Sequence, residues 1–340
     1  MTHPVVSEPP ESHSTLLGDR RAEPLAALLD LPWTDPEVRD LTAMLLAALD
    51  AAQQTGRSEL LRDALCFAEG RLQVRRLSRA GCAGIGAALE TVVTAHLATG
   101  DLARVRAVVS EALAGVPAVL AAETDSLGPV ATAYVDDLVR GDRASAVARV
   151  RRCVAEGMDV LEILLDVLEP AQHEVGRRWA VGRISVAQEH FCTAVTEFVM
   201  TDLYGLLFTA EESRRRLVAL HAPGSLHHVG LRMVVDVLEC LDWSTTYLVE
   251  EVPVDSLPGL VVDEQADLVL ISATMPGQVA AVKAMIEALH HDPRTRDVKV
   301  VVGGRPFNLA PGLAAEVGAD GWAADARATV EVCDRLVGAQ

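Results

Sequence analysis

Aromatic residues and lysines are scarce in this 340-residue chain, and their scarcity narrows the fold. Phe, Trp and Tyr make up 4% of the residues, while half of the residues are hydrophobic, mainly Ala, Val and Leu. β-Sandwiches draw on aromatic and β-branched residues, so this composition favours a helix-rich or α/β protein. The net charge is −18, and the only lysines are Lys283 and Lys299. Such an acidic chain has no general attraction for phosphate backbones, so we expect no nucleic-acid partner.

Closely spaced cysteine pairs and long apolar runs are also missing from the sequence, and we expect no secretory leader. The six cysteines are widely spaced without a Cys-x-x-Cys pair, which indicates reduced thiols in apolar cores. No apolar run approaches the roughly 20 residues that span a bilayer. The first residues, "MTHPVVSEPPESHST", are polar and do not resemble a signal peptide. We therefore expect a soluble, cytoplasmic protein without a membrane partner.

The first two thirds of the chain have the periodicity of helices. Residues 1–15 are expected to be a disordered tail, and residues 16–122 predict an N-terminal helical domain. In residues 126–212, apolar residues recur at i, i+3 and i+4 in four segments with short connections, which predicts a four-helix bundle. Pro170 lies within the third of these helices and is expected to kink or break it.

Residues 215–340 change period and predict a different architecture. Apolar runs of strand length lie at 216–221, 245–250, 267–272, 298–302 and 320–323. They alternate with helical stretches, one of which is expected near 308–317. This pattern predicts a flavodoxin-like, doubly wound, five-stranded parallel sheet of order 2-1-3-4-5. Ligands of such sheets bind beyond the carboxyl ends of strands one and three, where the strand order reverses.

Three loops at these carboxyl ends carry histidines, small hydroxyl residues or glycines. They border one crevice, where small residues would admit a long, narrow group between the sheet and its helices. The residues concerned are His221, His227, His228, Ser272, Thr274, Gly303 and Gly304. Each fragment has an ordinary alternative, because a loop histidine is most often solvated or hydrogen-bonded. A Gly-Gly pair after a strand is equally common in α/β proteins.

The helical bundle carries a second motif, Trp-x9-Glu-His. Trp179 closes one helix, and Ser185 with Gln188 forms a capping box that starts the next. Glu189 and His190 therefore fall in the early turns of that helix, close to the indole. An aromatic plate beside a carboxylate and an imidazole suits a ligand made of a sugar and a base. The alternative is that Trp179 and His190 only fill the core.

The three loops together resemble the cobalamin-binding domain of methionine synthase, carbon-skeleton mutases and CarH-type light sensors. In that family an acidic-x-His-x-x-Gly loop supplies the lower ligand of cobalt, which implies His227 as the metal ligand here. The resemblance implies these cofactor-binding residues: Ser225, Leu226, His227, Val229, Gly230, Ser272, Thr274, Gly303 and Gly304. His221 and His228 have no place in the motif and are expected to be surface or loop residues. Ser225 replaces the acidic residue, and an uncharged serine should orient the ligating imidazole less firmly.

The bundle and the loops together, over residues 126–340, resemble CarH-type proteins with their helical cap. The resemblance implies that Trp179 covers the adenosyl group of adenosylcobalamin and that Glu189 and His190 contact it. CarH-type proteins have a histidine directly after the tryptophan, which binds cobalt after illumination. This chain has Ala180 instead, so the state reached in light should be less sharply defined unless another histidine substitutes.

These resemblances predict a light sensor and not an enzyme. Light would cleave the cobalt–carbon bond and change the conformation and the oligomeric state. We expect a homo-oligomer, a dimer or tetramer with light-dependent assembly, or signalling to a protein partner. The layout also resembles photocobilins, which implies biliverdin as a second chromophore, although no motif assigns residues to it. The alternatives are a corrinoid protein that carries methyl groups for a methyltransferase, which Ser225 disfavours, and a non-photochemical cobalamin-binding sensor.

Overall fold

A computed structural model describes residues 20–78, 80–95, 102–121, 127–206 and 215–338. The tail expected at 1–15 lies outside these residues. The N-terminal helices are α2 (Ala22–Leu28), α3 (Pro36–Thr55), α4 (Ser58–Val74), α5 (Cys82–Thr94) and α6 (Leu102–Ala121). Helix α3 shows why they form where they do. The Asp35 side chain accepts a hydrogen bond from the Glu37 N–H at its start, and Gly56 adopts a left-handed conformation at its end.

The second helical block is the four-helix bundle that the sequence predicts, and we call it the cap. Its elements are α7 (Pro129–Val139), α8 (Arg143–Ala155), α9 (Val160–Glu162), a π-helical stretch η1 (Ile163–Leu168), α10 (Glu169–Ala180) and α11 (Val186–Tyr204). α9, η1 and α10 run on as one helix. Pro170 lies in the first turn of α10, directly after the π-helical stretch. Proline has no N–H to donate to a carbonyl of the preceding turn. The irregular, π-helical part of the helix therefore lies next to the proline at which the sequence predicts a kink or break.

The C-terminal block is a parallel five-stranded sheet in the predicted order β2-β1-β3-β4-β5. Its strands are β1 (Arg215–His221), β2 (Trp243–Leu248), β3 (Leu268–Ser272), β4 (Lys299–Gly303) and β5 (Gly321–Ala323). Its helices are α12 (Val229–Cys240), η2 (Val254–Ser256), α13 (Leu257–Asp263), η3 (Pro276–Gln278), α14 (Val279–His291), α15 (Arg305–Leu309), α16 (Leu313–Val317) and α17 (Ala326–Val337). The single helix expected near 308–317 is wrong. Pro311 and Gly312 separate α15 from α16.

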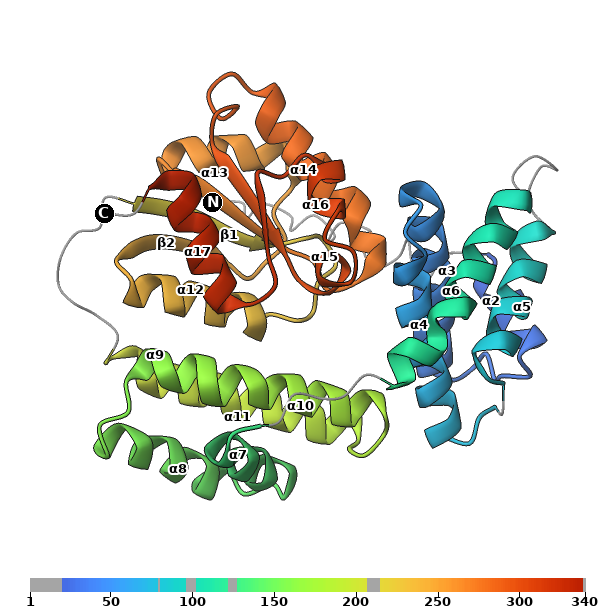
Figure 1. Cartoon of the computed structure of the whole chain (residues 1–340), viewed down its shortest axis with the longest axis horizontal. Coiled ribbons are helices and arrows are strands. Elements are labelled where there is room, and N and C mark those ends of the chain that lie inside the picture. The colour runs from blue at the N-terminus through green and yellow to red at the C-terminus, as the bar shows by residue number, and fades with distance from the viewer. Residues whose placement is uncertain (1–19, 79, 96–101, 122–126, 207–214, 339–340) are drawn as a thin grey trace, which may run out of the picture.

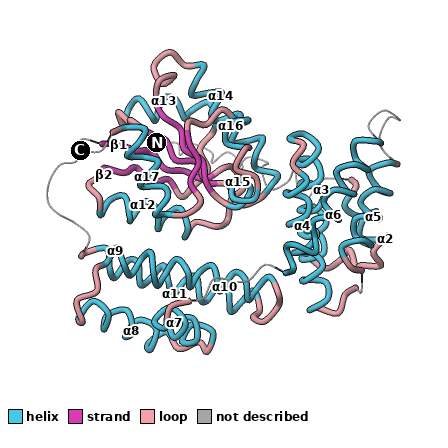
Figure 2. Tube along the Cα trace, viewed as in Figure 1, coloured by secondary structure: helices cyan, strands magenta, loops and turns pink. Residues whose placement is uncertain are grey.

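The sheet lies between two helical layers, which Figure 2 shows by element type. α12 and α17 cover one face, where Leu231, Val235 and Val332 join its buried residues. The cap packs beneath this layer (Figure 1), and Met233 and Val237 of α12 belong to the cap's buried core. Two contacts reinforce this interface. Glu169 accepts a hydrogen bond from the Ala326 N–H at 3.2 Å, and Arg232 donates to the hydroxyl of Thr201 at 3.0 Å.

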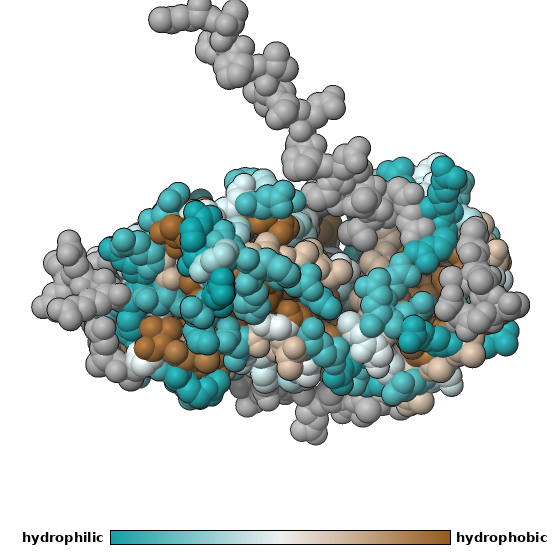
Figure 3. Space-filling view, turned by 90° about the horizontal axis from the view of Figure 1, so that it is seen from above, coloured by the Kyte–Doolittle hydropathy of each residue, from teal (hydrophilic) through white to brown (hydrophobic). Residues whose placement is uncertain are grey.

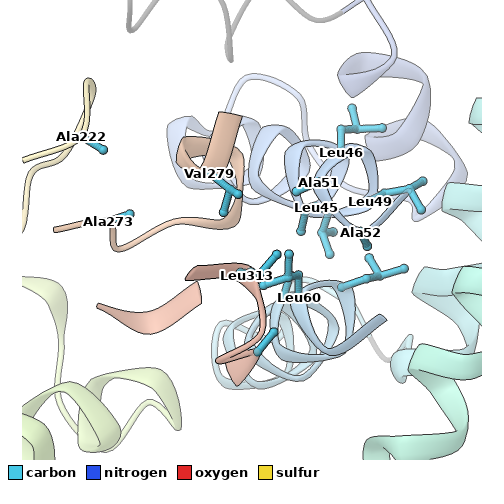
Figure 4. Close-up of a cluster of buried hydrophobic side chains, with 14 of the residues drawn as sticks. Leu45, Leu46, Leu49, Ala51, Ala52, Leu60, Ala222, Ala273, Val279 and Leu313 are labelled. Carbon is cyan, nitrogen blue, oxygen red and sulfur yellow. The ribbon is translucent and has the colours of Figure 1, made fainter. Parts of the chain in front are cut away.

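The opposite face of the sheet shares one apolar core with the N-terminal helices. Figure 4 shows part of it, with Leu45 of α3 and Leu60 of α4 on the side of Val279 and Leu313 of the sheet domain. The outer face drawn in Figure 3 is mainly hydrophilic, with apolar groups in small separate patches. Among the described helices, none is both long and apolar enough to cross a membrane.

Candidate functional site

The loop between β1 and α12 carries the histidine predicted to bind metal. His227 is an exposed residue, but the protein around it removes part of the water from its imidazole, and this desolvation lowers the pKa of the ring. The charge of Glu189 acts in the opposite direction, and His190 adds to the lowering. Glu189 and His190 lie in the first turns of α11. The structure therefore brings the loop of the sheet domain and the motif of the cap within electrostatic reach of each other. The lowered pKa favours the neutral imidazole, the form that binds a metal.

The two other histidines of this loop region form a cluster with a tyrosine that the sequence analysis did not single out. His221 Nε2 lies 3.1 Å from the Tyr247 hydroxyl, which donates to the His228 carbonyl at 3.1 Å. The His221 and His228 rings meet edge to face, with centroids 4.9 Å apart. Burial lowers the pKa of His221 to about 4. The surface position expected for His221 is therefore wrong, because it ends the buried strand β1.

A hydrogen-bond network joins the loops that follow β1 and β3 at the sheet's carboxyl edge. Ser225 Oγ lies 3.4 Å from Thr274 Oγ1, so the residue at the acidic position of the motif contacts the hydroxyl loop. Buried Gln278 accepts hydrogen bonds from the Thr274 and Met275 N–H groups at 2.8 and 2.9 Å and donates to the Pro223 carbonyl at 3.2 Å. Ser272 is the last residue of β3. Gln278 thus joins the Thr274 loop to the loop that carries Pro223, although no motif identified it.

The structure explains why some positions in these loops require glycine, but it does not explain all of them. Gly304 has a φ of +95°, and a Cβ there would overlap the carbonyl oxygen of Ala273. A Cβ at Gly303 would lie 3.3 Å from the Ala323 carbonyl oxygen. Contacts with Ala273, directly after β3, and with Ala323, the last residue of β5, therefore account for this pair without a ligand. Gly230, in contrast, has a helical conformation, and no atom lies within 4 Å of the place that a Cβ would occupy, so the fold itself does not require a glycine there.

The cap supplies Trp179, Glu189 and His190. His190 is 75% exposed, and its Nδ1 lies 2.7 Å from Glu189 Oε2. Glu189 also accepts a hydrogen bond from the Thr193 hydroxyl at 2.9 Å. Trp179 packs partly in the cap core, while its ring also contacts the N-terminal helix α4 through Phe67. This contact between distant parts of the chain was not predicted from the sequence.

These residues fit a metal whose coordination sphere is mostly supplied by a cofactor and not by the protein. One solvent-accessible imidazole completes a coordination sphere, whereas a bare structural or catalytic ion needs about three or four protein ligands. In the described parts of the chain, no group of three or more His, Cys, Asp or Glu residues could hold a metal ion. The surroundings also offer an apolar contact and unused hydrogen-bonding groups. Leu226 is 70% exposed, and within the described residues Trp179 Nε1 and His228 Nδ1 are buried without a hydrogen-bond partner.

Comparison with known proteins matches both blocks to protein-family models described as B12 binding domains, at residues 130–204 and 215–331. A corrinoid protein of Desulfitobacterium hafniense is 22% identical over 205 residues, which cover 59% of this chain and 94% of that protein. The HTH-type transcriptional repressor CarH of Myxococcus xanthus is 32% identical over 120 residues, or 35% of this chain and 39% of the repressor.

The fold also resembles a solved structure, the monomethylamine corrinoid protein of Methanosarcina barkeri. The TM-score is 0.53 at 21% sequence identity, and the match covers 60% of this chain and 97% of that one. At this identity the likeness concerns the fold alone. It agrees with a helical bundle followed by a parallel α/β domain.

Proposed function

We propose, from the premise that this chain is a cobalamin-binding protein with a helical B12-binding cap and a Rossmann-like B12-binding domain, that it is a light sensor using adenosylcobalamin. The observation that supports the site is that α12, which follows the His227 loop, packs against the cap. The charges of Glu189 and His190 in the cap act on His227. One residue set comes from the sheet domain and the other from the cap. A flat cofactor with an axial ligand on each face requires protein residues on both of its sides.

On the lower side, His227 would hold the cobalt through its neutral imidazole. Desolvation lowers the pKa of this imidazole, which favours the neutral form that a metal requires. Ser225 is engaged with Thr274 and supplies no charge to the imidazole. We therefore infer a histidine–cobalt bond that the protein tunes weakly.

On the upper side, Trp179, Glu189 and His190 would enclose the adenosyl group. The indole offers an apolar plate with an unused N–H, and the Glu189–His190 pair offers polar groups for the ribose and the base. Adenosylcobalamin supplies a cobalt–carbon bond that visible light cleaves. Departure of the adenosyl group would leave Trp179 without its contact, and the cap would rearrange to fill the space.

The feature that favours a sensor over a carrier is the contact of Trp179 with α4. A change at the upper face of the cofactor would thereby reach the N-terminal helices. Light-dependent assembly into a dimer or tetramer, a protein partner and biliverdin as a second chromophore stay predictions of the sequence resemblance. So does the expectation that the protein is no enzyme.

The second candidate function is a corrinoid protein that carries methyl groups for a methyltransferase. The names of the relatives favour it, because the corrinoid protein of D. hafniense matches over 94% of its length and CarH over only 39%. Ser225 and the anchored Trp179 are the residues that argue for the sensor.

Absorption spectra and hydrodynamic measurements, dark and illuminated, test the proposal. We expect His227→Ala to lose the spectrum of histidine-ligated cobalamin, while His228→Ala keeps it. Because free adenosylcobalamin is also light-sensitive, photolysis alone is not diagnostic. The sensor requires that light change the mass or hydrodynamic radius of the protein loaded with adenosylcobalamin, and not of the protein loaded with hydroxocobalamin. An unchanged protein after complete photolysis would leave the methyl carrier as the better explanation.

A further inference from the structure

We propose that Phe67 and Arg71 of the N-terminal helix α4 are positioning residues of the cobalamin site, which hold Trp179 in place and set the preference for a bulky upper ligand. The inference rests on the proposed function, since it assigns the N-terminal domain a part in the upper-face pocket. Neither residue belongs to the cap or to the sheet domain, the two parts that the B12-binding families cover.

Three contacts connect α4 with the end of α10. The Phe67 and Trp179 rings lie with centroids 5.1 Å apart and planes inclined by 52°. The Arg71 guanidinium lies over the same indole, with Cζ 5.2 Å from its centroid. Arg71 Nη1 also donates a hydrogen bond to the Trp179 carbonyl at 3.1 Å. Ring and backbone of Trp179 are thus both fixed from outside the cap.

Arg71 itself has little freedom to move. Its side chain is only 6% exposed, and its Nε and Nη2 donate to Glu37 Oε1 at 2.9 and 2.6 Å. Two charge-assisted hydrogen bonds to one carboxylate oxygen restrict the orientation of the guanidinium plane. The helices also approach closely here, since a Cβ at Gly70 would lie 3.1 Å from the Ala180 carbonyl oxygen.

The same side of α4 reaches the sheet domain. Asp63 accepts hydrogen bonds from Arg305, which directly follows Gly304. Asp63, Phe67 and Arg71 follow one another at intervals of four residues, so they share one face of the helix. α4 therefore connects the β4 loop with Trp179, the two positions between which a cofactor would lie. A second ion pair, Arg57 with Glu316, strengthens the contact with the sheet domain.

When the Trp179 indole is fixed in position, it discriminates between upper ligands of cobalamin, because only a large group such as adenosyl reaches it. Loss of the guanidinium or of the Phe67 ring would let Trp179 leave its place, and an adenosyl group would lose its plate. A hydroxyl upper ligand is too small to contact the indole, so displacement of Trp179 would not weaken its binding. The selectivity for adenosylcobalamin over hydroxocobalamin should therefore fall, with smaller change in the binding of the corrin itself.

The experiment compares Arg71→Met with Arg75→Met in the full chain. Arg75 is a matched control on the same helix, because it pairs with Glu37 and Asp35 but has no described contact with Trp179. Dissociation constants are measured in the dark for both cobalamins by absorption titration. We expect Arg71→Met to weaken adenosylcobalamin about tenfold relative to hydroxocobalamin, and Arg75→Met to change this ratio less than about twofold.

A double variant and the cofactor-free protein complete the test. In a Trp179→Ala background, Arg71→Met should cause no further loss of selectivity, and urea unfolding without cofactor should show that the two substitutions are not additive. If Arg71→Met does not fold, Phe67→Leu takes its place in the same comparison. Equal ratios for the position-71 (or position-67) and position-75 variants would overturn the inference. Failure of light to change the protein would overturn the proposed sensor and leave these binding results standing.

Discussion

Gly230→Ala separates the needs of the fold from the needs of the cofactor. Gly230 is the second residue of α12, has a negative φ, and has no atom within 4 Å of the position that a Cβ would take. In a helix, alanine is more favourable than glycine by about 0.5–1 kcal/mol. The cofactor-free protein should therefore become slightly more stable.

Cobalamin binding should respond in the opposite direction. The resemblance places the corrin against the loop that ends at Gly230, so the added methyl group would occupy space that the cofactor needs. A methyl group forced into a close-packed contact costs about 1–3 kcal/mol. This corresponds to a dissociation constant about 5 to 150 times higher.

Two measurements check this prediction. Urea unfolding of the cofactor-free protein gives the change in folding free energy, and absorption titration with hydroxocobalamin gives the change in affinity. Hydroxocobalamin is used because its small upper ligand keeps the cap from influencing the result. Unchanged affinity in the variant would show that the corrin does not approach Gly230, and the placement of the cofactor on the β1–α12 loop would be wrong.

The remaining predictions concern folding stability. Gly304→Ala should destabilise the protein by about 3 kcal/mol or more, through its φ of +95° and its overlap with Ala273, whereas Gly224→Ala, with a φ of +75° but free space, should cost only about 1–2 kcal/mol in urea unfolding. Burial raises the pKa of Asp236 from 3.8 to about 7. Between a pH of about 4 and a pH of about 7 the Asp236 carboxyl is ionised in the unfolded chain but still protonated in the folded protein. The free energy of unfolding therefore falls across this range as pH rises, by about 4 kcal/mol in total. Asp236→Asn should flatten that pH dependence, and parallel curves for both proteins would refute the assignment.

The architecture of the sheet domain follows closely from local patterns. The strand runs and their alternation with helices predict the parallel order β2-β1-β3-β4-β5, because right-handed crossovers leave few topologies. Helix periodicity does not reveal a short break, which is why the expected helix near 308–317 is two helices. The dipeptide Pro311-Gly312 was the available signal, since proline ends a helical run and glycine permits the turn.

Only the site residues that belong to a recognisable sequence motif could be predicted. The loop around His227 and the Glu189–His190 pair lie at recognisable positions of two resembling families. Gln278 and Tyr247 escaped notice, because each acts through tertiary hydrogen bonds to residues far along the chain. The buried environment of His221 likewise depends on packing around the end of β1, which a histidine-rich sequence does not disclose.

The position of the N-terminal helices bears on the choice between sensor and carrier. These helices share an apolar core with one face of the sheet, and α4 also holds the end of α10 in the cap. A carrier must expose its upper face to a partner enzyme, so the cap has to move away from the sheet domain. In this chain such a movement would break the contacts of Arg71 and Phe67 with Trp179 or carry the N-terminal helices along. Under the proposed sensor function, these contacts would pass a change of the cap on to the N-terminal helices.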